Sequence, residues 1–424
     1  MDKKEQETKN KLDRLTKSIG PLFKINKEEK EKKQNNTIFK TSEVVILLLI
    51  TTVVSLTMGG LIVYKYLDKQ TNPDDKNLQK FIKNYNYITK NYNGKIESEE
   101  ILDAALEGIL NKLDKNSVYL EEEASQNFNT ILEGSYKGIG IQIYQDKKGI
   151  IIYKVFENSP AEKTGLKEGD VIIKINNKST QSMTTKELVE KVKKTKSQNV
   201  KLTIKRENKE KNITIHLDTV NLKSVTSKTY NENSKKIGYI AVSIFASNTY
   251  NQFKENLTKL EKENIDSLII DLRSNSGGYL STAENMISLF LDSSHVIYQI
   301  QKNDKTTKYY SKGKETKKYK IIVLVDSSSA SASEVMTSAL KEQYGAKIIG
   351  TKTYGKGTVQ EMQNLENGDK YKITTKNWLT SEGKWIDGKG LEPDIEISLQ
   401  EKYFESLAEE DDNQLTTAKE EANK

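Results

Sequence analysis

One stretch, from Ile321 to Gln360, most strongly limits what this chain can fold into. It opens with the β-branched apolar run Ile321–Val325, which predicts a short buried strand. Small residues follow from Ser327 to Ala332, and after Ser333 the apolar residues take a helical spacing. Further segments alternate through residues 221–400, among them a helix predicted over 250–262 and a buried strand predicted over 267–272. This alternation indicates an α/β core.

A serine at this junction would be well placed for nucleophilic chemistry. Backbone N–H groups at the start of a helix are unpaired, and the helix dipole there favours a developing anion. Downstream, Lys356 lies between two glycines, which allow a tight turn that can drive the lysine inward.

The choice of base for such a serine is narrow. The chain has two histidines: His216 in a strand-like run and His295 after a Ser-Ser turn. A structural or surface role is favoured for both. There is no cysteine, so a thiol nucleophile is excluded. Serine chemistry would therefore need a lysine base, kept neutral by desolvation.

Several motifs carry a family resemblance. SASASE (329–334) followed by YGKGTVQ (354–360) resembles the active-site region of the carboxyl-terminal processing peptidases, the tail-specific serine proteases of family S41. The resemblance extends to DLRSNSGG (271–278) and TTKNWLTSEGKWIDGKGLEPDI (374–395), and covers roughly residues 75–400. It implies Ser331 as nucleophile, Lys356 as base and Gln360 as the glutamine that orients the lysine. The chain departs from the family's common pattern at two positions, where Ser276 replaces a proline and Trp378 replaces a tyrosine. Neither residue is expected to contact the catalytic dyad of Ser331 and Lys356.

Other residues of these motifs allow two interpretations. Gly277 would supply one oxyanion-hole N–H and Ala332 the other, although a glycine pair also marks an ordinary tight turn. Asp271 and Arg273 are interpreted as a structural ion pair at a strand end. Glu334 could serve as a triad carboxylate, but an electrostatic role at the helix N-terminus is favoured.

Residues 135–220 resemble a PDZ domain, on the motifs YKGIGIQI (136–143) and SPAEKTGLKEGDVIIKIN (159–176) and on a helix expected over 185–194. The resemblance implies a loop whose backbone N–H groups bind a chain-terminal carboxylate, beside an apolar groove. The loop residues would be Gly138, Ile139 and Gly140, and the groove residues Ile141, Ile143, Leu188 and Val192. The alternative is an ordinary β domain in which these apolar residues form the core.

The N-terminal part suggests a membrane anchor. Residues 1–43 are polar and lysine-rich, and Val44–Tyr64 contains no charged residue. About 20 apolar residues span a bilayer, so a single transmembrane helix is predicted over 44–66. The long leader and the missing cleavage site favour an uncleaved anchor. The larger basic count before the span places the N-terminal tail in the cytoplasm and the catalytic part outside the cell membrane.

The remaining segments complete the predicted organisation. Residues 74–134 are expected to be helical, with an apolar stripe from Ile101 to Leu113 and Ser98 as N-cap. The peptidase core is assigned to residues 221–400. Residues 401–424 are charged and are interpreted as a mobile tail or a short surface helix.

Composition and motifs exclude several function classes. The net charge is +7, but lysines are interleaved with acidic residues, so nucleic acid is not an expected partner. The sequence contains no HExxH, and the glycines around Lys356 lack Walker spacing, so no metal and no cofactor are expected.

The sequence thus predicts a membrane-anchored serine endopeptidase. Its expected substrates are unfolded proteins or proteins with exposed C-terminal ends, which the PDZ domain would recognise. A catalytically silent PDZ-containing peptide-binding scaffold is the alternative. Whether the PDZ domain activates or inhibits, and whether a homo-oligomer or a regulatory partner exists, are left open.

Overall fold

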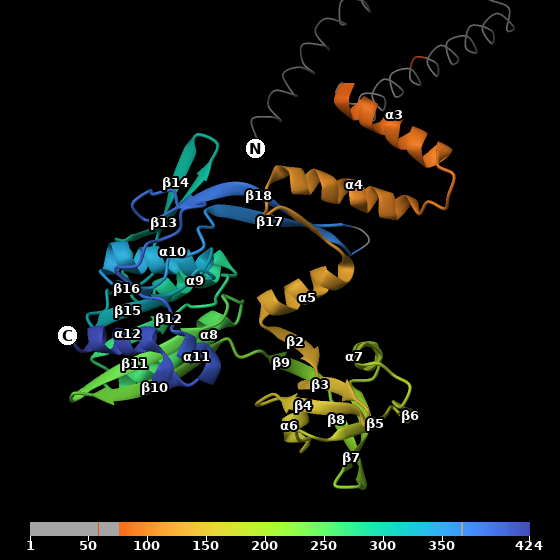
Figure 1. Ribbon diagram of the computed structural model, residues 1–424, viewed down its shortest axis with the longest axis horizontal. Helices are drawn as coiled ribbons and strands as arrows, with labels where there is room; N and C mark the ends of the chain where they lie inside the picture. Colours follow the sequence, from red (N-terminus) through yellow and green to blue (C-terminus); the bar gives the residue numbers. More distant parts are fainter. Residues whose placement is uncertain (1–57, 59–75, 366–367) are drawn as a thin grey trace, which may run out of the picture. The chain divides into compact units, whose positions relative to one another are not determined.

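The computed structural model describes residue 58 and residues 76–365 and 368–424 (Figure 1). The predicted N-terminal tail (1–43) and transmembrane helix (44–66) lie outside the described residues, apart from Met58. Among the described residues, no helix is long and apolar enough to cross a membrane. The transmembrane anchor therefore stays a prediction.

Residues 76–133 contain the expected helices: α3 (Lys76–Asn91), α4 (Ser98–Leu113) and α5 (Glu122–Glu133), with a short strand β1 (Val118–Leu120) before α5. Ser98 begins α4, where an N-cap was predicted. Of the apolar stripe on α4 only Leu110 is buried, while Leu102, Ile109 and Leu113 are exposed. Periodicity thus predicted the helix without indicating what covers its apolar face.

The region resembling a PDZ domain folds as a small β module. Its sheet has the order β3-β4-β5-β7-β8, with β6 paired to β5, and a separate ribbon joins β2 to β9. Val200, Leu202 and Ile204 alternate along β7 into one apolar core. The elements are β2 (Ser135–Gly138), β3 (Ile141–Asp146), β4 (Gly149–Val155), α6 (Pro160–Lys163), β5 (Val171–Ile175), β6 (Lys178–Ser179), α7 (Thr185–Lys193), β7 (Asn199–Arg206), β8 (Lys209–His216) and β9 (Asp218–Asn221).

The peptidase core is built on a six-stranded sheet of order β10-β11-β12-β15-β16-β19. The β10–β11 pair is antiparallel and all the following pairs are parallel. The predicted strands 267–272 and 321–325 lie side by side at its centre as β12 and β15. The strands are β10 (Val225–Glu232), β11 (Lys235–Val242), β12 (Ser267–Asp271), β15 (Lys320–Val325), β16 (Lys347–Gly350) and β19 (Ile395–Glu396).

Helices cover both faces of this sheet (Figure 1). Leu268 and Ile270 pack with α8 (Thr249–Lys262), α9 (Leu280–Ile287) and α10 (Ala332–Ala339), whereas Ile269 packs with the C-terminal helix α12 (Asn413–Asn423). Because successive side chains of a strand point to opposite faces, every residue of β12 is buried. A π-helical turn, η2 (Leu340–Tyr344), ends the α10 segment.

A second, antiparallel sheet has the order β1-β18-β13-β14, with β17 also paired to β18. It combines the strand that follows Lys356 with β1, so a segment N-terminal to the PDZ module reaches the catalytic half of the chain. The remaining strands are β13 (Val296–Lys302), β14 (Lys305–Tyr310), β17 (Thr358–Asn364) and β18 (Lys370–Leu379).

Of the two forms predicted for the C-terminal segment, a mobile tail or a short surface helix, the structure has helices, and one of them is packed on the sheet. The segment forms α11 (Glu401–Ser406), a 3₁₀ turn η3 (Glu409–Asp411) and α12. Leu415, Ala418 and Ala422 are buried on the sheet. Three apolar residues at helical spacing are enough to cover a sheet face, and the abundant charges of this segment conceal them in the composition.

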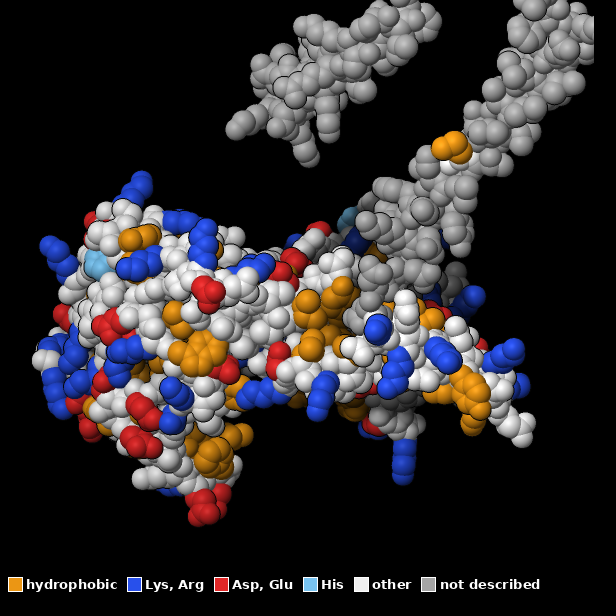
Figure 2. Space-filling view, turned by 90° about the horizontal axis from the view of Figure 1, so that it is seen from above, with side chains coloured by type: hydrophobic (Ala, Val, Ile, Leu, Met, Phe, Trp, Pro, Cys, Tyr) orange, Lys and Arg blue, Asp and Glu red, His pale blue; other side chains and the backbone are white. Residues whose placement is uncertain are grey.

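Charges are mixed over the surface. Figure 2 shows lysine and arginine side chains interleaved with aspartate and glutamate over the displayed face. This distribution agrees with the interleaving seen in the sequence.

Candidate active site

Ser331 lies at the junction between β15 and α10, as predicted. Its backbone has φ 55° and ψ −114°, a combination that non-glycine residues rarely adopt. Such outliers persist only where the surrounding structure enforces them, and they cluster at functional sites. The side chain is partly exposed, and the residue stands immediately before the first turn of α10.

The neighbouring serines hold this loop in place. The hydroxyls of Ser329 and Ser333 donate to the carbonyl oxygens of Leu272 and Asn275, each at 2.8 Å. Both serines are fully buried. Within the segment 329–333, Ser331 is therefore partly exposed and lies between two buried serines with structural roles.

Gly277 packs directly against the nucleophile loop. It has φ 103°, and an added Cβ would lie 2.8 Å from the Ala330 carbonyl oxygen and 2.9 Å from Ser331 Cβ. Only glycine fits this backbone. Its N–H, however, donates to Asn275 Oδ1 at 2.9 Å, so the prediction that Gly277 lends its N–H to an oxyanion is wrong for this conformation. Among the described residues, the N–H groups of neighbouring Gly278 and of Ala332 have no hydrogen-bond partner.

Glu334 joins the two halves of the site. One carboxylate oxygen accepts the backbone N–H groups of Ser331 and Lys356, both at 2.9 Å. The other accepts the Thr353 hydroxyl at 2.6 Å and the Gly355 N–H at 2.7 Å. The side chain is fully buried. The favoured role at the helix N-terminus is thus only part of its function, because Glu334 also fixes the backbone of the predicted base.

Two further hydrogen bonds fix the backbone at Lys356 and at the next residue. The indole N–H of Trp378 donates to the Lys356 carbonyl oxygen at 2.6 Å, and the N–H of Gly357 donates to Asp387 Oδ1 at 2.9 Å. The interpretation that Trp378 does not touch the dyad is therefore corrected. A buried tryptophan finds a partner for its N–H, and here the partner is the lysine's own carbonyl.

The electrostatic setting suits a lysine base. The pKa of Lys356 is lowered from 10.5 to about 8, chiefly by burial and also by the positive charge of Lys372, while Glu334 and Asp114 oppose the shift. With a pKa of about 8, about one tenth of the lysine is neutral at pH 7.

Gln360 lies on β17, four residues after the lysine. Its amide nitrogen donates to the hydroxyls of Thr358 at 2.8 Å and Thr374 at 3.2 Å. The β17–β18 register shifts between Val359 and Gln360. Such an irregularity re-aims side chains and is common next to active sites.

The two histidines lie elsewhere. His216 ends β8 in the PDZ module and contacts the Asn199 side chain at 3.1 Å. His295 precedes β13 and contacts Asp292 at 3.2 Å. No group of three or more potential metal ligands occurs in the part of the chain that the structure describes.

The PDZ residues divide into two sets. Ile141 and Ile143 on β3 and Val192 on α7 are half-buried, as residues lining a groove would be. The side chains of Ile139 and Leu188 are nearly fully buried in the module's core. Leu188 therefore offers little surface to a peptide, in contrast to its prediction as a groove residue, whereas the role predicted for Ile139 uses its backbone N–H and is not affected by the burial of its side chain.

The binding loop between β2 and β3 is built on glycines. Gly138 ends β2, and Gly140 has φ 84°. A Cβ on Gly140 would lie 2.2 Å from Ser159 Cβ. Glycine at 140 is therefore needed for the loop itself, independently of any bound peptide.

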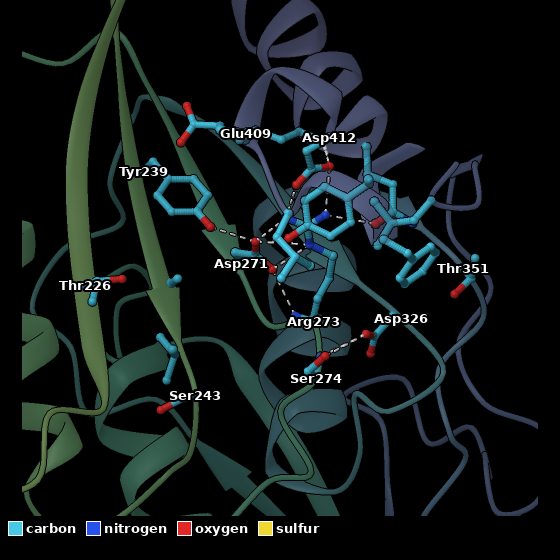
Figure 3. A pocket seen from close by; sticks show the side chains of 18 of the residues that line it. Thr226, Tyr239, Ser243, Asp271, Arg273, Ser274, Asp326, Thr351, Glu409 and Asp412 are labelled. Carbon is cyan, nitrogen blue, oxygen red and sulfur yellow. Dashed lines mark hydrogen bonds and ion pairs between the residues drawn. The ribbon is translucent and has the colours of Figure 1, made fainter. Parts of the chain in front are cut away.

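The predicted ion pair of Asp271 and Arg273 is present and extends further than predicted. Arg273 also binds Asp412 at 2.8 Å, just before α12, and the hydroxyl of Tyr239 donates to Asp271 at 2.8 Å (Figure 3). These groups line a cavity of about 880 Å³ at the ends of the parallel strands. Arg273 directly precedes the Ser274–Gly278 loop, so the C-terminal segment helps to anchor that loop.

Three family models and several curated proteins match parts of this chain. The sequence model of peptidase family S41 matches residues 236–397, that of the PDZ domain matches 127–205, and that of the CtpB activating protease N-terminal domain matches 62–124. The chain is 36% identical over 334 residues to the carboxy-terminal processing protease CtpB of Bacillus subtilis, covering 78% of this chain and 69% of that protein. This chain belongs to peptidase family S41.

Other relatives of this S41 peptidase agree. A CtpA-like serine protease of Staphylococcus epidermidis is 33% identical, covering 81% of this chain and 70% of the relative. The solved photosystem II D1 C-terminal processing protease is 21% identical, with a TM-score of 0.45, covering 75% of this chain and 92% of that one. The curated relatives and the family models show that the chain is a carboxyl-terminal processing serine protease with a PDZ domain.

Proposed function

We propose that this S41 peptidase hydrolyses peptide bonds with a Ser331–Lys356 dyad oriented by Gln360. The observation that carries the proposal is that the Glu334 carboxylate accepts the backbone N–H groups of both residues, the strained Ser331 and the half-buried Lys356. A carboxylate that fixes both backbones keeps the nucleophile and the base in a constant relation.

The mechanism follows from the two environments. Neutral Lys356 accepts the proton of the Ser331 hydroxyl as its oxygen attacks the scissile carbonyl carbon. The N–H groups of Gly278 and Ala332 stabilise the oxyanion. The lysine ammonium then protonates the leaving amine, and water hydrolyses the acyl-enzyme by the same route in reverse. No cofactor takes part in these steps.

The PDZ module would select the substrates. The loop 138–140 binds a free chain-terminal carboxylate through backbone N–H groups, and β3 pairs with the peptide backbone. Half-buried Ile141, Ile143 and Val192 would favour apolar terminal side chains. Suitable substrates are therefore unfolded proteins or proteins with exposed C-terminal ends.

We further propose that residues 44–66 anchor the chain in the cell membrane, with the N-terminal tail inside and the catalytic part outside. An uncharged apolar segment of sufficient length supports this topology. External protease on intact cells should remove the catalytic part and spare an N-terminal tag. Protection of a C-terminal tag would reverse the orientation.

Peptide turnover tests the dyad. The full-length chain, in mild detergent, should degrade an unfolded protein, and Ser331→Ala, Lys356→Ala and Lys356→Arg should each lose at least about 10³-fold in kcat. Arginine fails because its guanidinium does not deprotonate at usable pH. Activity retained in Lys356→Arg would exclude the lysine as base, and an inactive wild type that still binds peptides would favour the scaffold.

Matched peptides test the selection of substrates. The full-length Ser331→Ala protein should bind a peptide with a free C-terminal carboxylate more tightly than its amidated twin. Equal affinities would exclude carboxylate recognition. Gly140→Val is unsuitable as a binding mutant, because its side chain would clash with Ser159 and disrupt the loop.

A further inference from the structure

A short turn upstream of the PDZ module lies against the base side of the site. Residues 114–117, called here the 114–117 turn, follow α4 and precede β1. Strand β1 pairs with β18, where Val118 lies opposite Lys372. Lys115 places its ammonium 4.6 Å from the centre of the Tyr354 ring, two residues before Lys356. The turn therefore contacts both the loop and the sheet that carry the predicted base.

The turn is internally fixed by one carboxylate. Asp114 Oδ1 accepts the backbone N–H groups of Asn116 at 2.7 Å and Ser117 at 2.9 Å, and Oδ2 accepts the Ser117 hydroxyl at 3.0 Å. Burial alone would raise the pKa of Asp114, but the hydrogen bonds from Asn116 and Ser117 outweigh it and hold the pKa below 3.8. Asp114 is therefore ionised at neutral pH, and the turn is preorganised.

Two side chains of the turn reach the threonines that hold Gln360. The amide nitrogen of Asn116 donates to Thr358 Oγ1 at 3.0 Å, and the same oxygen receives the Gln360 amide. Ser117 Oγ accepts the N–H of Thr374, whose hydroxyl also receives the Gln360 amide. Ser117 is buried. The turn thus fixes each threonine, and the two threonine hydroxyls in turn fix the amide group of Gln360.

We propose that the 114–117 turn is a positioning element of the peptidase site, in which Asn116 and Ser117 fix Gln360 through Thr358 and Thr374. This inference rests on the proposed dyad. Because both amide hydrogens of Gln360 are engaged by threonines, its carbonyl oxygen is the group left to accept a hydrogen bond from the lysine ammonium. The base side is therefore completed by a segment on the N-terminal side of the PDZ module.

The turn also contributes charge. Asp114 and Glu334 raise the pKa of Lys356, whereas burial, Lys372 and Lys115 lower it. Loss of the negative charge at 114 should therefore lower the lysine's pKa. The rising limb of the pH–activity profile should move to lower pH, whereas mere structural damage would reduce the amplitude without moving the limb.

The test compares two asparagines that contact the same sheet. Asn116→Ala removes the contact with Thr358, whereas Asn129→Ala removes a contact between α5 and Lys370 of β18, away from Gln360. In the full-length protein, Asn116→Ala should lower kcat about tenfold or more with KM within about twofold, and Asn129→Ala should leave both unchanged. Unfolding curves should show that both variants are folded.

Coupling distinguishes positioning through Gln360 from an independent effect. If Asn116 acts through Gln360, the double variant Asn116→Ala/Gln360→Ala should be no slower than Gln360→Ala alone. Additive losses would overturn the proposal, as would wild-type kcat in Asn116→Ala. A second variant, Asp114→Asn, should move the rising limb of the pH–activity profile to lower pH. An unchanged limb would refute the proposed effect of the Asp114 charge on the pKa of Lys356.

The outcomes separate this inference from the proposed dyad. Full activity in Asn116→Ala alongside inactive Ser331→Ala and Lys356→Ala would refute the positioning role and leave the dyad standing. An active Lys356→Ala would refute the dyad and the positioning role with it.

Discussion

The two sides of the active site are built in opposite ways. The nucleophile side is framed by buried, hydrogen-bonded side chains, those of Glu334, Ser329, Ser333 and Asn275. The base side, from Lys356 to Gln360 with β18 and the 114–117 turn, is half-buried and contains several charges. A strained serine needs a rigid frame to persist, whereas a lysine base needs a tunable pKa. Substitutions on the nucleophile side should therefore change stability and rate together, and those on the base side should change pH dependence.

The largest expected effect is that of Glu334→Gln. An amide offers one acceptor oxygen where the carboxylate accepts four hydrogen bonds, so backbone N–H groups of the dyad lose their partner. We expect at least about 100-fold lower kcat and about 1–3 kcal/mol lower stability for each unsatisfied group. Denaturant unfolding and turnover measure both. A stable but slow variant would show that Glu334 acts on chemistry alone.

Next in size is Arg273→Ala, which tests the anchor behind the nucleophile side. It leaves Asp271 and Asp412 buried without their partner, which should cost about 3–5 kcal/mol. Arg206→Ala in the PDZ module, which breaks a similar buried pair with Asp170, is the comparison. Both should destabilise, but only Arg273→Ala should loosen α12, as measured by hydrogen exchange in residues 413–423.

The pH dependence tests the base side. Activity should rise with pH through about 8, since neutral Lys356 is the active form. Stability should respond as well. Between about 8 and 10.5 the unfolded chain binds the proton that the folded chain has lost, so stability from this group increases with pH there. Lys356→Met should remove that slope. A profile with a limb near 6 would instead indicate a histidine.

The smallest effect is expected for Lys372→Met. Its charge lowers the pKa of Lys356, so removing it should move the activity limb upward with little loss of maximal rate. Methionine keeps the apolar stem that packs in this half-buried position. Lys376→Met, on the same strand but paired with Glu361, is the matched control and should leave the limb in place.

Much of the fold and the site could be predicted from the sequence. The strand 321–325, the helix over 250–262 and the PDZ helix over 185–194 appear within one residue of their expected bounds. These elements are short and strongly patterned, and a capping box of Thr184 and Glu187 begins the PDZ helix. The junction at Ser331 and the glycine-bracketed Lys356 were likewise recognisable from motifs. The prediction of Leu188 as a groove residue was less accurate, because groove and core positions share one apolar pattern.

Contacts between residues that lie far apart in the sequence could not be predicted. Asn116 and Thr358 are 242 residues apart in the sequence, and no local signal connects them. Trp378 was regarded as remote from the dyad because no local sequence signal links its strand, β18, to the loop that carries Lys356. The tail 401–424 seemed too charged to pack, yet one sheet face needed a cover that three apolar side chains could provide.

The sequence by itself determined which residues are candidates for the chemistry and which segments form strands and helices, because propensity, glycine placement and apolar periodicity act over a few neighbouring residues. The tertiary structure alone decided how the two sides are joined. Hydrogen bonds from Glu334 and from the 114–117 turn form only when distant segments are brought to the same place, and burial, which sets the pKa of Lys356, is a property of the packed molecule.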